Sequence, residues 1–510
     1  MRLYRTALVL VAILLIAAAL RIYQLERKSL WVDEFWSALL PAGRGYVQHK
    51  LPRNVLIADP PNLFDLNSAR PIRDVWLSEQ EGNAPPLYVM VMRMWGEALG
   101  LGPRSLRGLS VVASVAAVGL MFLVVRDLTG QRAPALWAAT LMALAGPQIQ
   151  YAQEARNYAL LVLEGLGAAA ALVRIEKRGP SRPREAALTV CVLAMALTHY
   201  FALGALVALA VYAAIRLRGK SLMRVGGCFA VAAILWGVLG APVALRQFRN
   251  INDPRATGFL ADDAPNRALG NLHRFGLLPV RFFTEPMIRS RPVAAVAGAV
   301  AMLALPLLAF RRREMTLWSL WLWLTVLPLL ALDIWRGTQH LSYVRYALLA
   351  SPALYAMVAT VLADRGGWIR HLPPAVVSLA CAISVPAAYE AWWKADWRAL
   401  AGQIDRHRAA NEVIIFYDHA TDGRLADEPD SNFLYTSYYR RPPFGPTALM
   451  DRPPDGPFVR QLREPLGGAL IIAGHGKDVS PAAPGARLSR LAFEPGAAVL
   501  WRAEWTAEDK

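Results

Sequence analysis

The hydrophobic residues of this chain fall into separate blocks of about 18–22 positions, divided by short polar and basic connections. Blocks of this length predict membrane crossings, because a helix needs about 20 apolar residues to span a hydrocarbon core of roughly 30 Å. The blocks lie at about 7–24, 105–125, 133–150, 157–173, 186–215, 225–244, 293–310, 315–332, 346–363 and 372–389. The pattern therefore predicts an α-helical polytopic membrane protein.

The run at 186–215 is too long for one ordinary crossing, and His199 lies near its centre. Basic residues, which favour cytoplasmic loops, flank it on both sides. They are Arg174, Lys177, Arg178, Arg182 and Arg184 before the run, and Arg216, Arg218, Lys220 and Arg224 after it. We therefore predict that the run crosses twice, with a turn near Thr198–Phe201. The total is then about eleven transmembrane helices.

Composition and charge support this class and fix a topology. The chain is 55% hydrophobic and only 18% charged, which is too apolar for an ordinary soluble domain. Its net charge of +17 lies mostly in short loops, so we attribute the charge to membrane orientation and predict no nucleic-acid partner. We expect the N-terminal block to be an uncleaved anchor. Connections predicted on the cytoplasmic side contain Arg126, Arg132, Arg311–Arg313, Arg365 and Arg370, and those predicted outside are 25–104, 151–156, 245–292 and 333–345.

Two long polar regions lie on the predicted outer face. The first loop, about 25–104, contains Pro85-Pro86 and then Leu87–Leu99, which we interpret as an amphipathic helix in the membrane interface. The C-terminal region predicts a helix and short strands, separated by Pro- and Gly-rich connections. These are a helix at Asp396–Ala409 and strands at Glu412–Tyr417, Ala469–Ala473 and about Ala497–Arg502. We therefore predict a transmembrane domain at 1–390 and a small extracytoplasmic α/β domain at 391–510.

Candidate chemistry begins directly after the first block, where Asp33 and Glu34 stand among aromatic residues. Neighbouring carboxylates in a partly desolvated place raise one pKa, which favours a general base or a cation ligand. The structural alternative is a helix start that Asp33 caps. No cysteine contributes a disulfide framework or a thiol metal site, because all three lie inside apolar blocks: Cys191, Cys228 and Cys381.

Further candidates lie on the predicted outer turns. Glu154 and Arg156 could hold a metal, a sugar or a phosphate, or could pair with each other to fix the turn. His199 and Tyr200 occupy the turn of the double crossing, where a hydrogen-bonded structural histidine is the alternative to a ligand.

Arg345 and its neighbours precede the block at 346–363. A guanidinium at this position suits a lipid phosphate because it donates two parallel hydrogen bonds, although interfacial anchoring by Arg and Tyr explains the same pattern. His340, Tyr343 and Tyr346 accompany it. Glu164 falls inside a predicted crossing, where a carboxyl is a functional candidate that needs a partner within the bundle.

In family order, five stretches resemble the polytopic glycosyltransferases of the C-type superfold, in the bacterial branch related to protein O-mannosyltransferases and the lipid A aminoarabinose transferase (glycosyltransferase family 39-like). They are Trp31-Val32-Asp33-Glu34, Asn83-Ala84-Pro85-Pro86-Leu87-Tyr88, Gln153-Glu154-Ala155-Arg156-Asn157-Tyr158, Thr198-His199-Tyr200-Phe201 and Val344-Arg345-Tyr346. The resemblance covers roughly residues 10–365.

This resemblance implies an inverting transfer of a sugar from a polyprenyl-phosphate donor to an envelope lipid, glycan or protein on the periplasmic face of a bacterial inner membrane. It implies catalysis by Asp33, the base for the acceptor hydroxyl, with Glu34 lining the same cavity, and a hold on the lipid phosphate by Arg345. The other substrate-binding residues it implies are Glu154, Arg156, Tyr158, His199, Tyr200 and Tyr346.

Some members of this group use a divalent cation and others do not. Relatives commonly carry His, or Glu and Lys, where this chain has Asn83 and Ala84. We therefore predict no metal and no other cofactor. The alternatives are a transporter or lipid flippase, or a polymerase or ligase of the O-antigen type. A transporter leaves the long acidic first loop unexplained, and the polymerase class places its catalytic residues in a large late loop.

Overall fold

The computed structural model forms two compact units, which we describe separately. The helical unit comprises Met1–Leu25, Glu79–Met92 and Arg104–Trp392, and the sheet unit comprises Glu26–Ser78, Arg93–Pro103 and Trp393–Lys510. The structure describes residues 2–250, 260–262, 264, 266–285, 292–310, 312–390, 395–409, 412–417, 429–463, 468–473, 478–493 and 498–505. The predicted first loop is therefore divided between the two units, and most of it clusters with the C-terminal residues.

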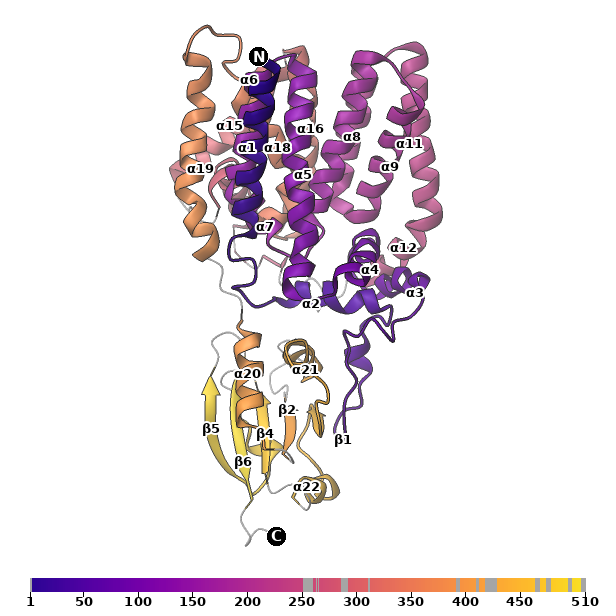
Figure 1. The fold of residues 1–510 in the computed structure, drawn as a ribbon, viewed down its shortest axis with the longest axis vertical. Helices are drawn as coiled ribbons and strands as arrows, with labels where there is room; N and C mark the ends of the chain where they lie inside the picture. Colours follow the sequence, from indigo (N-terminus) through magenta and orange to yellow (C-terminus); the bar gives the residue numbers. More distant parts are fainter. Residues whose placement is uncertain are drawn as a thin grey trace. The chain divides into compact units, whose positions relative to one another are not determined.

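Long helices that run alongside one another build the helical unit (Figure 1). Each predicted apolar block contains at least part of one of these long helices or of a shorter one. These helices are α1 (Arg2–Ile22), α5 (Pro103–Thr129), α6 (Arg132–Leu144), α8 (Tyr158–Arg178), α9 (Arg182–Thr198), α10 (Leu203–Arg216), α11 (Gly219–Leu239), α15 (Pro292–Phe310), α16 (Thr316–Arg336), α18 (Ser351–Thr360) and α19 (Leu372–Glu390).

Among the described residues, 6 helices are long and apolar enough to cross a membrane, with a mean hydropathy of 1.6–2.5. Three shorter apolar helices accompany them, at Tyr200–Arg216, Pro292–Leu307 and Val344–Thr360. The chain is therefore a membrane protein by length and composition, and the number of crossings stays a prediction.

The run at 186–215 forms two helices, as predicted. Helix α9 ends at Thr198, His199 is extended with φ −159° and ψ 136°, and the short helix η4 (Tyr200–Ala202) leads into α10. Extended backbone at His199 interrupts the helical ladder, so one apolar run folds back on itself at this point.

Shorter helices fill the regions between the long ones. Helix α7 (Gly146–Ala152) follows a break at Ala145, and α12 (Ala241–Asn250) and α14 (Arg267–Thr284) lie within the segment predicted as an outer loop. Before α18 come η7 (His340–Ser342), α17 (Val344–Ala347) and η8 (Leu348–Ala350). The 3₁₀ turn η3 (Glu79–Glu81) precedes α4 (Leu87–Leu99), whose bounds are those of the predicted amphipathic helix.

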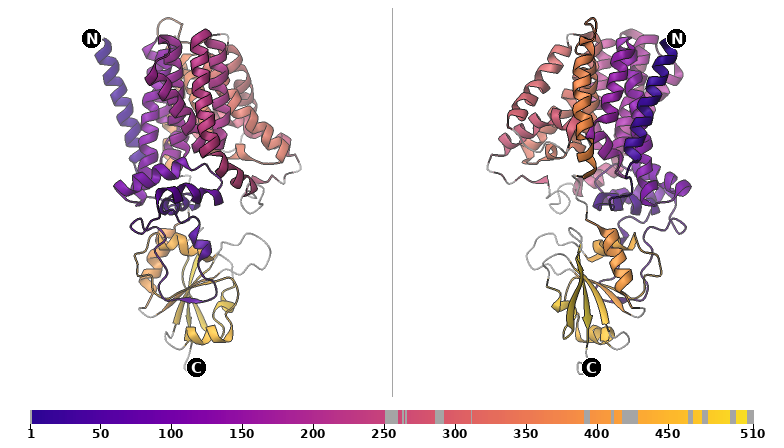
Figure 2. Two further views of the ribbon diagram at one scale, coloured as in Figure 1. Left: turned by 90° about the vertical axis from the view of Figure 1, so that its right-hand side faces the viewer. Right: turned by 60° about the vertical axis from the view of Figure 1, so that its left-hand side comes forward.

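A six-stranded mixed sheet forms the sheet unit, in the order β1-β3-β2-β4-β6-β5 (Figures 1 and 2). Strand β2 pairs in parallel with β3 and β4, whereas β1, β5 and β6 join in antiparallel fashion. The strands are β1 (Leu56–Ile57), β2 (Val413–Tyr417), β3 (Thr447–Met450), β4 (Gly468–Ala473), β5 (Arg487–Phe493) and β6 (Val499–Glu504).

Both faces of the central strands are covered, which explains their continuous apolar sequences. Side chains alternate across a strand, so Ile415 faces a core that includes Phe458 of α22 (Gly456–Arg463). Phe416 faces the opposite way and meets Phe433 of α21 (Pro429–Ser437), with ring centroids 5.6 Å apart. Helix α20 (Trp397–His407) packs against α21 and against β5 and β6.

The early part of the chain is fastened to the C-terminal part by polar contacts within the sheet unit. Arg53 donates to Asp430 at 3.0 Å, and Asn54 donates to Asp451 at 2.7 Å. Asp59 accepts from two backbone N–H groups at the turn that precedes β3. Strand β1 then adds an edge to the sheet, so the first loop and the last residues fold together.

Candidate functional site

The predicted catalytic carboxylates begin the short helix α2 (Val32–Leu39) in the sheet unit. Glu34 is fully buried and its carboxylate accepts from the backbone N–H of Trp31 at 3.2 Å. This is the acidic half of a capping box, in which the third helical residue reaches back to the residue before the helix. Asp33 is half-buried. The sequence allowed Asp33 to cap the start of this helix, and in the structure Glu34 makes the capping contact.

Helix α2 is held by aromatic residues of α21 and the residues that follow it. The ring of Phe35 lies 4.7 Å from that of Tyr435 and 5.6 Å from that of Tyr438. The hydroxyl of Tyr439 accepts from the backbone N–H of Leu30 at 2.6 Å. Because these contacts fix the chain before and inside α2, the position of Asp33 within the sheet unit is well defined.

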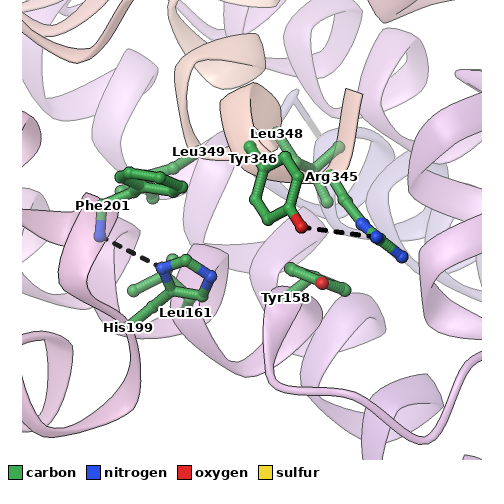
Figure 3. Close-up of a pocket in the computed structure, with 8 residues that line it drawn as sticks. All are labelled: Tyr158, Leu161, His199, Phe201, Arg345, Tyr346, Leu348 and Leu349. Atoms are coloured by element: carbon green, nitrogen blue, oxygen red, sulfur yellow. Dashed lines mark hydrogen bonds between the residues drawn. The ribbon is translucent and has the colours of Figure 1, made fainter. Parts of the chain in front are cut away.

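In the helical unit, Arg345 lies against two tyrosines of its own segment. Its guanidinium carbon is 5.0 Å from the ring centroids of both Tyr343 and Tyr346. Its Nη2 donates to the hydroxyl of Tyr346 at 3.3 Å (Figure 3). Cation–π contact on two rings holds a guanidinium in place.

A small enclosed cavity lies beside these residues, with a volume of about 10 Å³. This is room for roughly one water molecule. Its walls bring together four predicted site residues from three segments of the chain (Figure 3). The lining residues are Tyr158, Leu161, His199, Phe201, Arg345, Tyr346, Leu348 and Leu349.

His199 is held as a neutral ring. Its Nδ1 accepts from the backbone N–H of Phe201 at 3.1 Å, which leaves the proton on Nε2. Burial, and to a smaller extent the charges of Arg156 and Arg345, lower the pKa of His199 to about 3. Both guanidinium groups therefore act on one imidazole, which serves as a neutral hydrogen-bond donor and not as a cation.

One more aromatic ring, that of His340, extends this wall. Phe201, His340 and Tyr346 contact one another edge to face, with centroid distances of 5.3–5.5 Å. Asp333, fully buried in the last turn of α16, accepts from His340 Nδ1 at 2.6 Å. It also accepts from the backbone N–H groups of His340 and Leu341, both at 2.9 Å. The carboxylate thus fixes both the loop and the tautomer of His340.

The turn after α7 supplies the second charged pair that the sequence predicted. Glu154 and Arg156 surround a short turn in which the Arg156 N–H donates to the Glu154 carbonyl at 2.8 Å. Burial raises the pKa of Tyr151 well above its ordinary value, and Glu285 and Glu154 raise it further while Arg345 lowers it. Acidic and basic groups from three segments therefore act on the same ring. Glu154 and Arg156 do not line the small cavity.

Tyr200, which the sequence predicted as a substrate-binding residue, lies next to His199 in the chain but makes its hydrogen bond to α12. Its hydroxyl donates to the side chain of Gln247 on α12, and Tyr200 is not part of the cavity wall. Gln247 in turn donates to the carbonyls of Glu79 and Ala84. This chain of bonds gives Tyr200 a structural task, holding the segment around η3 against α12.

The intramembrane carboxyl of Glu164 has a partner in the neighbouring helix. Thr198 donates its hydroxyl to Glu164 Oε1 at 2.9 Å, and the Asn157 amide donates to the Thr198 carbonyl at 2.8 Å. These bonds join α8 to the end of α9 directly before His199. Glu164 therefore helps to position the turn.

Three charged residues near the site were not predicted from the sequence. Glu79 is buried, which raises its pKa to about 8 against the opposing effect of Arg156. Arg281 pairs with Glu285 at 2.7 Å and donates to the Ser342 carbonyl at 2.8 Å, which braces the loop before Arg345. The four-residue spacing of Arg281 and Glu285 was a readable helical signal, whereas nothing in the sequence marks Glu79 as buried.

No protein-family model matches this chain, and no curated protein matches it. Several solved structures are similar. ArnT from Cupriavidus metallidurans in the apo state is 13% identical, with a TM-score of 0.46 and coverage of 98% of both chains. The archaeal oligosaccharyltransferase AglB from Archaeoglobus fulgidus, in complex with an inhibitory peptide and a dolichol-phosphate, is 12% identical, with a TM-score of 0.45, and covers 92% of this chain and 70% of its own.

The arabinofuranosyltransferase AftD from Mycobacteria is 14% identical, with a TM-score of 0.41, and the match covers 99% of this chain and 42% of AftD. All three are glycosyltransferases of the C-type superfold, the group that the sequence motifs resemble. At this degree of similarity, the tasks of individual residues follow from the geometry of this chain.

Proposed function

We propose that this chain is an inverting membrane glycosyltransferase, which moves a sugar from a polyprenyl-phosphate donor to a hydroxyl group of an envelope lipid, glycan or protein. The observation that carries the proposal is that Arg345 lines one small cavity together with Tyr158 and the neutral ring of His199. A guanidinium group beside an N–H donor forms a place where an anion gains charge-assisted hydrogen bonds. A sugar phosphate ester provides such an anion at the membrane surface.

Arg345 is the proposed ligand of the donor phosphate. Its contacts with two tyrosine rings hold the guanidinium group in a fixed orientation before the donor binds. When the bond between the sugar and the phosphate breaks, negative charge grows on the leaving phosphate. A preorganised cation lowers the free energy of that transition state more than that of the bound donor.

Asp33 is the proposed base. It takes the proton of the acceptor hydroxyl while the acceptor oxygen bonds to the anomeric carbon and the polyprenyl phosphate departs. General-base catalysis of this kind contributes about 10²–10⁴ in rate. Glu34, whose carboxylate caps α2, supports the position of Asp33. The reaction is proposed to need no metal ion, and to take place on the periplasmic face of a bacterial inner membrane.

The transporter alternative depended mainly on an intramembrane carboxyl without an assigned partner. Thr198 now accounts for one oxygen of Glu164, in a bond that joins two helices. A positioning task therefore explains this residue, and no observation among the described residues favours transport over glycosyl transfer.

Two substitutions test the proposal with purified protein in nanodiscs, a radiolabelled polyprenyl-phosphate sugar and envelope extract as the acceptor. Arg345→Ala should weaken donor binding roughly 10- to 100-fold, since hydrogen bonds to charged groups contribute about 1.5–3 kcal/mol. Asp33→Asn should abolish transfer while donor affinity persists. Arg365→Ala, at an exposed arginine between α18 and α19, is the matched control.

Unchanged donor affinity in Arg345→Ala would reduce this arginine to an interfacial anchor. Full turnover in Asp33→Asn would remove the base from Asp33. Transfer that stops in EDTA and returns with added Mg²⁺ would overturn the metal-free mechanism.

A further inference from the structure

A second, larger cavity lies within the sheet unit, between the end of α20 and the segment that follows α21. Its volume is about 490 Å³, within the range of roughly 300–1,000 Å³ that is usual for small-molecule sites. Three arginines and one carboxylate contribute to its wall. The lining residues are Asp405, Arg408, Ala409, Tyr439, Arg440, Arg441 and Pro443.

Two of these arginines are held firmly. Arg440 is 8% exposed, pairs with Asp405 at 2.7 Å and lies over the ring of Phe444. Arg408 donates to the carbonyls of Glu412 and Phe444. Ordered guanidinium groups lose little conformational entropy when a ligand binds, so the free-energy cost of ordering them is small.

Gly445 makes room for Arg408. A Cβ at this position would lie 2.1 Å from Arg408 Nη2, and the residue has φ +69°. Only glycine adopts this left-handed conformation readily. The turn after Pro443 is therefore shaped around the guanidinium group.

The charges in this pocket do not cancel. Three arginines against Asp405 leave an excess of two positive charges, and the Asp405 side chain is 52% exposed, so water weakens its effect. Burial and then the charge of Arg440 lower the pKa of Arg408, against the opposing charges of Asp405, Glu412 and Asp59. Like charges in one pocket repel each other, and a bound anion would offset that repulsion.

We propose that this pocket binds a phosphoryl group carried by a larger molecule, such as a phosphorylated saccharide or a phospholipid headgroup. Guanidinium groups match phosphate because their planar forks donate pairs of parallel hydrogen bonds to its oxygens. The volume exceeds what a phosphate ion alone would fill. The site goes beyond the proposed glycosyl transfer and does not depend on it, although Tyr439 joins its wall to Leu30, just before α2.

Arg441 is the best position for a test, because it lines the pocket on the exposed side and its removal breaks no contact of the fold that the described residues show. Arg441→Gln removes one charge, and Arg440→Gln removes a buried one. Arg452→Gln, at an exposed arginine outside the pocket, is the matched control. Thermal unfolding of each variant verifies that the fold persists.

The full-length protein is placed in phosphatidylcholine nanodiscs and titrated by calorimetry. One arm uses inorganic pyrophosphate, and the other compares short-chain phosphatidic acid with short-chain phosphatidylcholine. We expect binding of pyrophosphate, phosphatidic acid or both, weakened about 5- to 20-fold by Arg441→Gln and at least as much by Arg440→Gln. The Arg452→Gln control and Arg345→Ala should retain it, which separates this pocket from the proposed donor site.

Binding of pyrophosphate alone assigns a soluble phosphorylated ligand, and binding of phosphatidic acid alone assigns a lipid headgroup. Absence of both, or equal affinity in the wild type, Arg441→Gln and a folded Arg440→Gln, would overturn the proposal. Loss of binding in Arg345→Ala with no loss in the pocket variants would also overturn it, since the phosphate would then occupy the helical unit.

Discussion

Glu79 gives the sharpest prediction because the structure buries a carboxyl that the sequence places in a polar loop. Its side chain lies in η3 with only 3% of its surface exposed, and its pKa is raised to about 8. Burial is the larger cause, and the positive charge of Arg156 opposes it. In the folded protein Glu79 is therefore mostly protonated at neutral pH, whereas in the unfolded chain it ionises near 4.5.

The direction of the pH effect follows from proton binding. Between pH 4.5 and 8 the folded state keeps a proton that the unfolded state releases, so the free energy of unfolding falls as pH rises. The folded and unfolded pKa values of Glu79 differ by about 3.5, and each pKa unit corresponds to about 1.36 kcal/mol. The free energy of unfolding therefore falls by at most about 5 kcal/mol across this pH range. The loss should be complete above about pH 8.

Glu79→Gln removes the titration while keeping the shape of the side chain. In detergent between pH 5 and 9, the midpoint of its thermal unfolding should vary less with pH than that of the wild type. The stabilisation of the variant relative to the wild type should be largest at pH 9. Glu81→Gln, in the same turn but exposed, is the control and should follow the wild type. Parallel pH profiles for Glu79→Gln and the wild type would refute the reasoning, because they would show that Glu79 is ionised in the folded state.

Two further substitutions test packing and positioning. Gly298→Ala should lower stability by roughly 1–3 kcal/mol, because its Cβ would lie 1.9 Å from the Gly276 carbonyl oxygen. The control Gly226→Ala, with open space around the Cβ, should leave stability unchanged. Equal unfolding midpoints for the two variants would contradict the close helix packing. Asp333→Ala should cost at least about 2 kcal/mol and weaken donor binding, since it leaves His340 and two backbone N–H groups without their acceptor. Calorimetric unfolding and donor titration measure both effects, and an unchanged midpoint would argue against a structural task for Asp333.

The helices of this chain could be predicted because membrane crossings are encoded locally. An apolar block of sufficient length forms a helix whatever its neighbours are, since only internal hydrogen bonds satisfy its backbone in lipid. The two helices on either side of His199 were predicted from the length of the apolar run together with the basic residues that flank it. The bounds of α4 followed from its apolar and polar spacing.

Helix α14 was missed because its charges interrupt the hydropathy pattern. Arg274 and Arg281 would not favour a buried helix in isolation. In the folded protein Asp262 pairs with Arg274 at 2.6 Å and Glu285 pairs with Arg281 at 2.7 Å, so the charges are compensated. Compensation by residues outside the helix itself does not appear in an average over the positions of the helix.

The sheet could be predicted only in part, for a related reason. The buried strands β2 and β4 stand out as apolar runs, whereas β3 has four residues and β1 only two. Strand β1 exists because it pairs with β3 about 390 positions further along the chain, in the register Leu56 to Ala448. Such a pairing has no local signal, and neither does the joining of the first loop to the C-terminal residues.

The two adjacent carboxylates show why residue types alone could not assign the site. Successive residues of a helix point about 100° apart, so Asp33 and Glu34 cannot serve one point in space. The longer side chain, Glu34 at the third helical position, reaches back to the backbone N–H of Trp31, and the shorter one, Asp33, occupies the second position of the same turn. A pair that looks like shared chemistry in the sequence therefore divides into a cap and an acid-base candidate. That division depends on where the helix begins, and the helix begins where the aromatic contacts of Phe35 and Tyr439 hold the chain.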